Sequence, residues 1–289
     1  MRLKIVPLVT GFKEGRLDAG TYARHAERLL DAGVDYVFAM GSTGLGPSLS
    51  FEERKACVGA LAKLEDRVIH QVGSLDLEES IELAGLAKRG GARYISALPP
   101  YYFPRLGEDS MVKYFTKISS IHPTILYNFP LATGYDISPA VVKAVNGKGG
   151  EIVGVKDTVT DVAHMLSFKW ELGPDFMVFS GPDQVILPAL NSGTDGAVAG
   201  SGNYIPETLG ALFRESATEK GLSLQKTVAQ AARLAQKHGQ WSANYSLVRL
   251  VKGYDAGEPR PPIFPLSPEE EAELGSEIRE VLPEGDSPG

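Results

Sequence analysis

One lysine at the end of an apolar segment has the clearest chemical potential in this sequence. Lys156 directly follows Ile152–Val155, a short run with strand character. Apolar surroundings disfavour an ammonium ion and favour the neutral amine, which is the nucleophile that forms an imine with a carbonyl. The run alone leaves a second interpretation open, in which Lys156 forms an ion pair with the adjacent Asp157 at the rim of the fold.

Two other segments carry polar groups directly after apolar runs. Tyr127 ends such a run and precedes Asn128 and Pro130, so its phenol could carry a proton, although tyrosines at strand ends more often serve packing. The turn Gly41–Gly44 offers the hydroxyls of Ser42 and Thr43 and several backbone amides. Such a turn suits a carboxylate ligand, and a purely structural turn is the alternative.

These residues need elements that bring them together, and the sequence repeats one pattern eight times. Short apolar or β-branched runs alternate with stretches of helical periodicity. The runs are Ile5–Val9, Tyr36–Ala39, Ile69–Val72, Tyr94–Ala97, Thr124–Tyr127, Ile152–Val155, Met177–Ser180 and Gly196–Ala199. We predict an α/β fold, a (β/α)8 TIM barrel with appended C-terminal helices, whose strand ends would collect the polar groups.

A doubly wound open sheet has the same local pattern and is the alternative fold. The sequence contains neither a GxGxxG nor a GxxxxGK[ST] phosphate loop, and this absence favours the barrel. The expected helices include residues 18–32, 50–64, 77–89, 110–121, 138–146 and 183–191. Ser50 with Glu53 predicts a capping box, Ser110 predicts a helix cap, and Gly33 and Gly90 predict helix ends.

The predicted organisation has three parts. Residues 1–205 form the (β/α)8 barrel core, residues 206–282 form a helical extension packed on the barrel, and residues 283–289 form a disordered tail. The proline-rich stretch Glu258–Pro265 interrupts the extension. Because proline restricts the backbone, we expect this stretch to be a fixed crossover rather than a flexible linker.

Composition narrows the class of function. The chain has 289 residues and a net charge of -7, which disfavours nucleic acid and anionic membrane surfaces as partners and favours a small-molecule substrate. No apolar stretch approaches the roughly 20 residues that span a bilayer. The single cysteine, Cys57, and the lack of a signal-like N-terminus predict a cytoplasmic protein. The five histidines are scattered, so we expect no metal site.

Four motifs, in this order along the chain, resemble the dihydrodipicolinate synthase and N-acetylneuraminate lyase superfamily over essentially the whole sequence. They are Gly41–Gly44, Pro100–Tyr102, Tyr127–Pro130 and Gly154–Asp157. The longer strings GSTGLGPSLS, PPYYFPR, LYNFPLATG, GVKDT and PRPPIFPL look most like archaeal 2-keto-3-deoxygluconate aldolases of Entner-Doudoroff sugar breakdown. The resemblance implies a lyase that cleaves this sugar acid reversibly to pyruvate and glyceraldehyde, as a homotetramer without metal or organic cofactor.

The resemblance also implies roles for single residues. Lys156 would form the Schiff base, Tyr127 would be the acid/base assisted by Thr43, and Tyr102 would be a relay donated by a neighbouring subunit. Ser42 and Thr43 would bind the pyruvyl carboxylate. The remaining substrate-binding residues would be Thr158, Gly181, Asp183 and Ala199, with Arg105 for a 6-phosphate.

The sequence departs from its relatives at positions that bear on the substrate. Leu45–Pro47 replaces an acidic residue of the synthases, and Ala132 stands where they place an arginine for the carboxylate of the aldehyde, so aspartate semialdehyde is a poor candidate. Phe129 and Gln236 stand where phosphate-accepting aldolases often have tyrosine and arginine, while Arg105 keeps the phosphorylated substrate possible. The alternatives are another pyruvate aldolase or lyase, a dihydrodipicolinate-synthase-like enzyme, and a non-enzymatic 2-oxo acid sensor.

Overall fold

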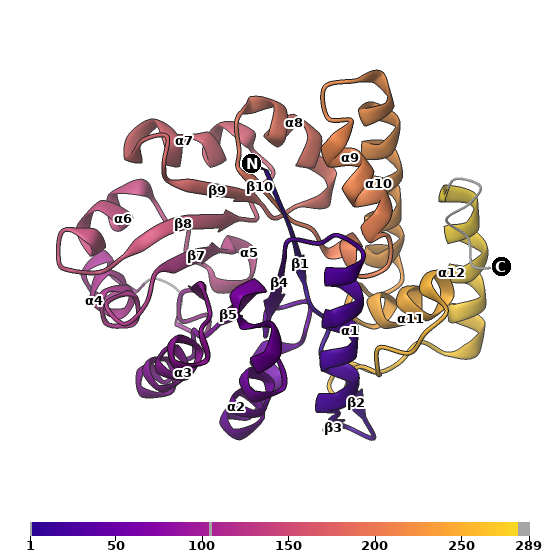
Figure 1. The fold of residues 1–289 in the computed structure, drawn as a ribbon, viewed down its shortest axis with the longest axis horizontal. Coiled ribbons are helices and arrows are strands. Elements are labelled where there is room, and N and C mark those ends of the chain that lie inside the picture. The colour runs from indigo at the N-terminus through magenta and orange to yellow at the C-terminus, as the bar shows by residue number, and fades with distance from the viewer. Residues whose placement is uncertain (1, 104–105, 283–289) are drawn as a thin grey trace.

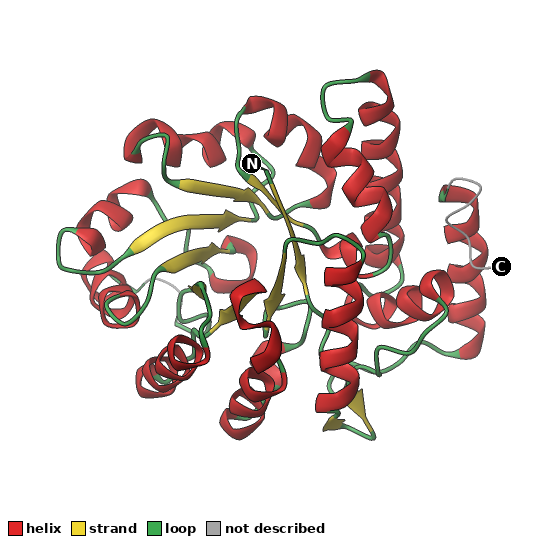
Figure 2. Ribbon diagram, in the orientation of Figure 1, coloured by secondary structure: helices red, strands yellow, loops and turns green. Residues whose placement is uncertain are grey.

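A closed barrel of eight parallel strands forms the centre of the molecule (Figure 1; Figure 2). The computed structural model describes residues 2–103 and 106–282. The barrel strands are β1 Leu3–Pro7, β4 Tyr36–Ala39, β5 Val68–Gln71, β6 Tyr94–Ala97, β7 Thr124–Asn128, β8 Ile152–Asp157, β9 Met177–Ser180 and β10 Gly196–Val198. The predicted TIM barrel is confirmed, and the open sheet is excluded because β1 pairs with both β4 and β10.

Helices surround the barrel and continue beyond it. They are α1 Ala19–Asp31, α2 Phe51–Ala60, α3 Leu77–Gly90, α4 Glu108–Ser119, α5 Pro130–Thr133, α6 Pro139–Asn146, α7 Val162–Leu172, α8 Ile186–Ser192, α9 Pro206–Arg214, α10 Glu219–Lys237, α11 Trp241–Lys252 and α12 Pro268–Val281. Short 3-10 turns are η1 Gly46–Ser48, η2 Ala62–Arg67, η3 Asp183–Val185 and η4 Gly200–Asn203, and β2 Phe12–Lys13 pairs with β3 Arg16–Leu17.

Several predicted helix ends need correction. Ser50 forms the expected capping box with Glu53. Ser110 is not a cap: α4 begins two residues earlier and places two acidic residues in its first turn, where the helix dipole favours them. Gly90 is the last residue of α3, and Gly91, with φ +99°, ends the helix instead. Only glycine adopts this left-handed conformation without steric cost, which explains the shift by one residue.

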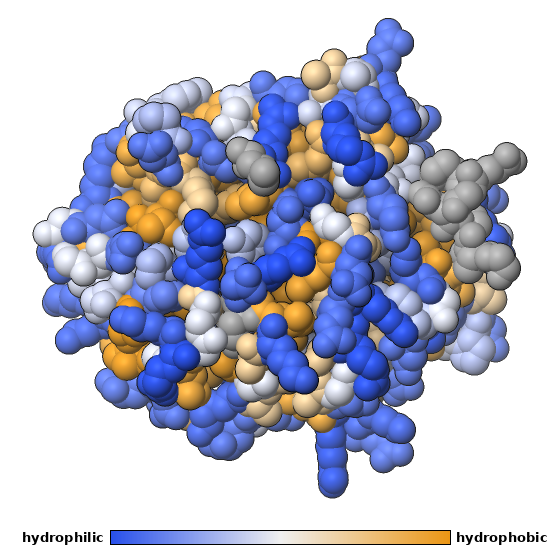
Figure 3. Space-filling model, in the orientation of Figure 1, coloured by the Kyte–Doolittle hydropathy of each residue, from blue (hydrophilic) through white to orange (hydrophobic). Residues whose placement is uncertain are grey.

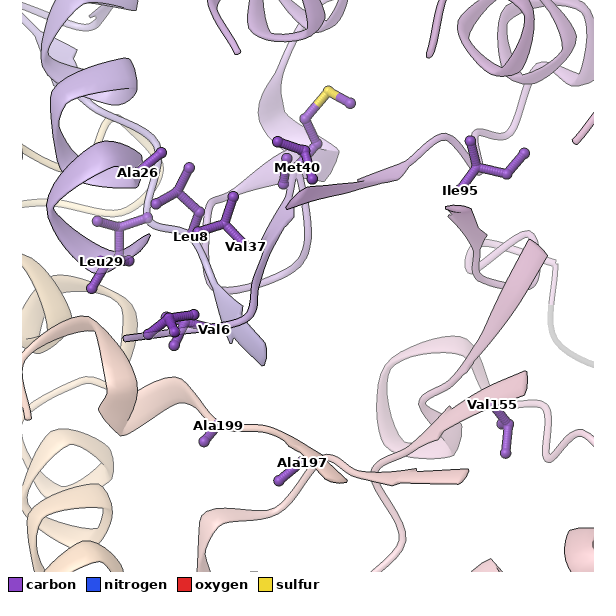
Figure 4. Packing of buried hydrophobic residues seen from close by; sticks show 14 of the residues in the cluster. Val6, Leu8, Ala26, Leu29, Val37, Met40, Ile95, Val155, Ala197 and Ala199 are labelled. Atoms are coloured by element: carbon purple, nitrogen blue, oxygen red, sulfur yellow. The ribbon is translucent and has the colours of Figure 1, made fainter. Parts of the chain in front are cut away.

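Alternation along the strands separates two apolar layers. Inside the barrel lie Ile5, Phe38, Ile69, Leu98, Ile125, Tyr127, Phe179 and Val198. The residues between them in sequence point outward and pack against the helices, as Val6 and Val37 do beside Leu29 of α1 (Figure 4). Because side chains in a strand alternate between faces, neighbouring residues at a strand end reach different environments.

The C-terminal helices continue from the barrel without a break. Helix α9 packs against β1 and α10, and α12 packs against α10 and α11 at one side of the barrel (Figure 1). Arg260 fixes the proline-rich crossover, because its guanidinium pairs with Glu53, binds the carbonyl oxygen of Ser48 and lies over the ring of Phe12. The predicted tail, residues 283–289, lies outside the described residues.

The face of the molecule seen in Figure 3 is mainly polar. Figure 3 shows hydrophilic side chains over most of one face, with hydrophobic side chains visible between them. None of the helices in residues 2–103 and 106–282 combines the length and apolar character needed to cross a membrane.

Closure of the barrel should depend on Gly196, where β10 meets β1. A Cβ at this position would overlap the carbonyl oxygen of Leu3. We expect Gly196→Ala to lower the free energy of unfolding by about 1–3 kcal/mol or more, because the backbones must separate. Gly59 lies exposed in α2 with open space around it, so Gly59→Ala should raise that free energy by up to about 1 kcal/mol. Denaturant unfolding of both variants tests this, and equal stability would contradict it.

Candidate active site

Lys156 occupies the C-terminal end of β8 and points into the barrel. Only 4% of its surface is exposed. Its Nζ lies 3.9 Å from the ring centre of Tyr127 and 4.8 Å from that of Phe38. Among the described residues, Nζ makes no hydrogen bond or ion pair within normal distance limits. The amine is therefore enclosed by aromatic rings and left available for chemistry.

The alternative ion pair between Lys156 and Asp157 is wrong. Strand alternation directs these adjacent side chains to opposite sides of β8. Asp157 is fully buried, and its carboxylate binds Nδ1 of His164 at 2.7 Å. The nearest acidic residue in sequence is thus engaged elsewhere, which keeps Lys156 unpaired.

Tyr127 faces Lys156 from the neighbouring strand. The two residues are register partners between β7 and β8. The ring of Tyr127 is stacked with Phe129 and meets Phe38 edge-on, at centroid distances of 5.8 and 5.6 Å. Its hydroxyl donates to Oγ of Ser42 at 3.3 Å. These contacts fix the phenol between the lysine and the polar turn after β4.

The turn containing Ser42 and Thr43 is built by close backbone packing. A Cβ at Gly46 would overlap the carbonyl oxygen of Met40, so only glycine fits there. The indole Nε1 of Trp241, at the start of α11, donates to the carbonyl oxygen of Ser42 at 3.1 Å. A residue of the C-terminal extension thus holds the turn in place.

A cavity of about 280 Å³ opens at this end of the barrel. It brings together seven of the residues singled out in the sequence: Ser42, Thr43, Tyr127, Lys156, Thr158, Gly181 and Asp183. Gly181 must lack a side chain, because a Cβ would lie 2.7 Å from Cγ2 of Thr158. The cavity therefore joins the nucleophile, a phenol and several hydroxyl groups.

Two other sequence candidates lie elsewhere, and a third is outside the described residues. Ala199 is fully buried in the outer apolar layer, and its neighbours Val198 and Gly200 line the cavity instead (Figure 4). Because successive side chains of a strand point to opposite faces, Ala199 points away from the cavity that its two neighbours line. Tyr102 is 73% exposed and does not line the cavity of its own chain. Arg105 lies outside the described residues.

Asp183 organises the turn that follows β10. One carboxylate oxygen accepts a hydrogen bond from the backbone N–H of Gly200, and the other accepts from the N–H and hydroxyl of Ser201. Burial raises the pKa of Asp183, and the hydrogen bonds from Ser201 and Gly200 and the charge of Lys156 oppose this shift. Asp183 thus acts on the shape of the cavity wall as well as on its charge.

Several lining residues could not be predicted from the sequence. Thr160, Gln184, Gln240 and Trp241 contribute to the cavity, together with Gln236, a departure from the aldolase pattern described above. Gln236 lies in the last turn of α10 and Trp241 begins α11, about two hundred residues after Ser42. Contacts over such a separation leave no local pattern in a single sequence.

Tertiary folding also gathers His238, Glu273 and Glu277, which are separate in sequence. Potential metal-ligand atoms of these three residues lie within 4.8 Å of one another. Lys237 binds both carboxylates, and His238 binds Glu277 at 2.8 Å. The lysine supplies the positive charge here, so the group serves as an ion-pair cluster that joins α10 to α12.

The family model described as the dihydrodipicolinate synthetase family matches residues 2–281. The chain belongs to this family. A relative from Saccharolobus solfataricus, named a 2-dehydro-3-deoxy-phosphogluconate/2-dehydro-3-deoxy-6-phosphogalactonate aldolase, is 40% identical over 96% of this chain and 95% of its own length.

Solved structures of family members share the whole fold. A Sulfolobus 2-keto-3-deoxygluconate aldolase in complex with D-KDPG superposes with a TM-score of 0.92 at 38% identity, covering 97% of this chain and 96% of the other. A variant of a Sulfolobus solfataricus aldolase in a pyruvate complex gives 0.91 at 37% identity, covering 96% of each chain. The family resemblance inferred from the motifs is confirmed.

The burial of Lys156 generates a prediction about stability. Nζ of Lys156 is a buried polar group without a hydrogen-bonding partner among the described residues, which is unfavourable in either protonation state, so we expect Lys156→Met to raise the free energy of unfolding by about 1–3 kcal/mol. Lys143→Met is the control: Lys143 is half exposed and paired with Glu171, and its replacement should change stability by less than about 0.5 kcal/mol. Thermal and denaturant unfolding at neutral pH measure both changes. A destabilised Lys156→Met protein would show that the amine has a partner.

Proposed function

We propose that this protein is a class I aldolase that reversibly cleaves 2-keto-3-deoxygluconate to pyruvate and glyceraldehyde through a Schiff base on Lys156. The buried, unpaired amine of Lys156, 3.9 Å from the ring of Tyr127, is the observation that carries this proposal. The family membership and the names of the two aldolase relatives support it.

Imine formation begins when the neutral amine of Lys156 attacks the C2 carbonyl of the substrate and water is lost. The rings of Phe38 and Tyr127 lie 4.8 and 3.9 Å from Nζ and enclose it at the wall of the cavity. Ser42 and Thr43 lie at the same end of the cavity with hydroxyls and backbone amides. They are suited to bind the carboxylate next to C2.

The resulting iminium withdraws electrons from C3, so the bond between C3 and C4 can break. The phenol of Tyr127 gives its proton to the hydroxyl that leaves as water when the imine forms, and its phenolate then accepts the proton of the C4 hydroxyl as the C3–C4 bond breaks. This step releases glyceraldehyde and leaves the pyruvate enamine. Protonation at C3 and hydrolysis of the imine then release pyruvate and restore the lysine. The contact between the hydroxyls of Tyr127 and Ser42 provides a path for the proton within the cavity.

Part of the cavity wall suits an uncharged polyol. Gln184, Gln236 and Gln240 contribute neutral carboxamides to this wall. Lys156 is the only cationic residue among the described residues that line this cavity. A phosphate would have little positive charge to meet there, so the unphosphorylated acid is the preferred substrate in our proposal.

An adjoining apolar cavity argues against an aldehyde with a second carboxylate. It measures about 420 Å³ and shares Ser42, Phe129 and Trp241 with the first. Ala132, Leu45 and Ile263 line it with apolar groups, and Arg260, which also lines it, is already paired with Glu53. This lining supports a sugar-acid aldolase over a synthase that condenses aspartate semialdehyde.

The proposal extends to the working form of the enzyme. It is a cytoplasmic homotetramer of the archaeal type that acts in Entner-Doudoroff sugar breakdown and requires neither metal nor organic cofactor. Tyr102 is exposed and packs edge-on against Phe103, at a centroid distance of 5.5 Å. This placement leaves it free to enter the cavity of a neighbouring subunit.

Chemical trapping tests the Schiff base directly. Incubation with pyruvate and reduction with borohydride should add the mass of the reduced adduct to the peptide containing Lys156 and to no other lysine peptide. Lys156→Ala should lose this adduct and its aldol turnover while keeping the circular dichroism of the wild type. An adduct spread over surface lysines would exclude the mechanism and favour a 2-oxo acid sensor.

If Lys156 carries the adduct, retro-aldol rates on several sugar acids would distinguish this aldolase from one that acts on another substrate.

Removal of one phenolic oxygen tests the proton transfer. Tyr127→Phe should lower kcat by about 10²–10⁴, the usual contribution of a placed acid/base group, while pyruvate still forms a reducible adduct. Tyr36→Phe is the control, because Tyr36 begins β4 at the opposite end of the barrel. Steady-state cleavage of 2-keto-3-deoxygluconate measures both variants. An unchanged rate for Tyr127→Phe would assign the proton transfer to another group.

A further inference from the structure

A closed ring of three hydrogen bonds and one ion-pair contact lies behind the two residues of the proposed reaction. Asn128 follows Tyr127 on β7, Asp157 follows Lys156 on β8, and the two are register partners with fully buried side chains. Nδ2 of Asn128 donates to Oδ1 of Asp157 at 3.2 Å. This bond directly joins the two strand ends that carry the phenol and the amine.

Two further residues close the ring. Nδ2 of Asn128 also donates to Oδ1 of Asp136 at 2.7 Å. The ring of His164, on α7, places Nδ1 2.7 Å from Oδ2 of Asp157 and Nε2 3.3 Å from Oδ2 of Asp136. Around the ring, the carboxamide of Asn128 and the imidazole of His164 alternate with the carboxylates of Asp136 and Asp157, which are the acceptors. We refer to Asn128, Asp136, Asp157 and His164 as the carboxylate ring.

The carboxylate ring also holds the loops that leave both strands. Oδ1 of Asn128 accepts from the backbone N–H of Ile137, and Oδ1 of Asp157 accepts from that of Val159. Both backbone contacts are within 3.0 Å. Loss of the ring would therefore release the ends of β7 and β8 and the segments that follow them.

We propose that the carboxylate ring is a positioning device that sets the relative placement of Lys156 and Tyr127, and that it is complete only while His164 is an imidazolium. This inference rests on the aldolase function proposed above. A neutral imidazole has a single N–H and can donate to one carboxylate only. Its second nitrogen would then direct a lone pair at the other carboxylate, and the ring would open on that side.

Charges around His164 favour the imidazolium. The acidic groups that face it are Asp157 at the end of β8, Asp136 in the segment between α5 and α6, and Asp161 at the start of α7. Burial lowers the pKa of His164, but the hydrogen bond to Asp157 and the three negative charges outweigh it and raise this pKa above the ordinary value.

The lysines near α7 are engaged elsewhere, since Lys143 and Lys169 pair with Glu171 and Asp195.

The direction of the pH dependence follows. Because the pKa of His164 is raised on folding, its stabilising contribution is fully present below the ordinary histidine pKa and is lost as the pH rises through the folded value. Turnover should decline on the same basic limb, since the separation of amine and phenol is no longer fixed. The effect should fall on kcat more than on KM, because the ring does not line the cavity.

Asp136→Asn is the sharpest variant, because Asp136 is half exposed and its replacement removes one negative charge with little change of shape. We expect the basic limb of the kcat profile to move to lower pH by about 0.5–1 unit, as loss of a nearby opposite charge requires.

His164→Gln should lower kcat at neutral pH by about tenfold, leave KM within about threefold, and remove the limb assigned to histidine. His122→Gln is the control: His122 binds the carbonyl oxygen of Ala92 just before β7 begins, at the opposite end of that strand.

Histidine side-chain NMR of the full-length protein gives a readout that does not depend on turnover. The His164 signal, assigned by its loss in His164→Gln, should titrate above the ordinary histidine range in the wild type and lower in Asp136→Asn. A neutral His164 at pH 6, or an Asp136→Asn protein with an unshifted titration and kcat profile, would overturn the inference. If the wild type shows the expected titration but neither traps pyruvate nor cleaves the sugar acid, the proposed function fails instead.

Discussion

The structure depends on keeping one lysine amine buried without an ion pair. Burial of a polar amine without a hydrogen-bonding partner is unfavourable, and the packing of the surrounding elements must compensate for it. Here the inner apolar layer and the rings of Phe38 and Tyr127 enclose Nζ of Lys156. The closed barrel provides this enclosure, because all eight strands contribute to one interior and no strand edge is left open.

The adjacent acidic residue shows how the amine stays unpaired. Asp157 follows Lys156 directly, yet strand alternation turns its carboxylate away, where His164 and Asn128 bind it. One structural feature thus has two effects. It removes the nearest negative charge from the amine, and it links the ends of β7 and β8 behind the cavity.

The C-terminal extension takes part in the site as well as in the fold. Trp241 binds the turn that holds Ser42 and Thr43, while Gln236 and Gln240 line part of the cavity. Arg260 fixes the proline-rich crossover against Glu53 of α2. The barrel therefore supplies the reacting groups, and the extension supplies part of the wall that meets the distal end of a substrate.

The sequence by itself determined the local features. Apolar runs placed all eight strands to within two residues, and the position of Lys156 and Tyr127 at strand ends indicated the pair that shares the cavity. These predictions succeed because strand formation and side-chain alternation depend on near neighbours. The end of α3 depends on one backbone angle, at Gly91, and the position predicted from the sequence differs from it by one residue.

Tertiary structure alone decided the features that join distant segments. Val198 and Gly200 line the cavity, whereas Ala199 between them does not. The fold also brings Trp241 to the turn of Ser42, and it closes the carboxylate ring through His164 and Asp136. It also resolved the two interpretations of Lys156 in favour of an unpaired amine. The physical reason is that such contacts depend on the closure of the barrel and on the packing of helices around it, which no short stretch of sequence encodes.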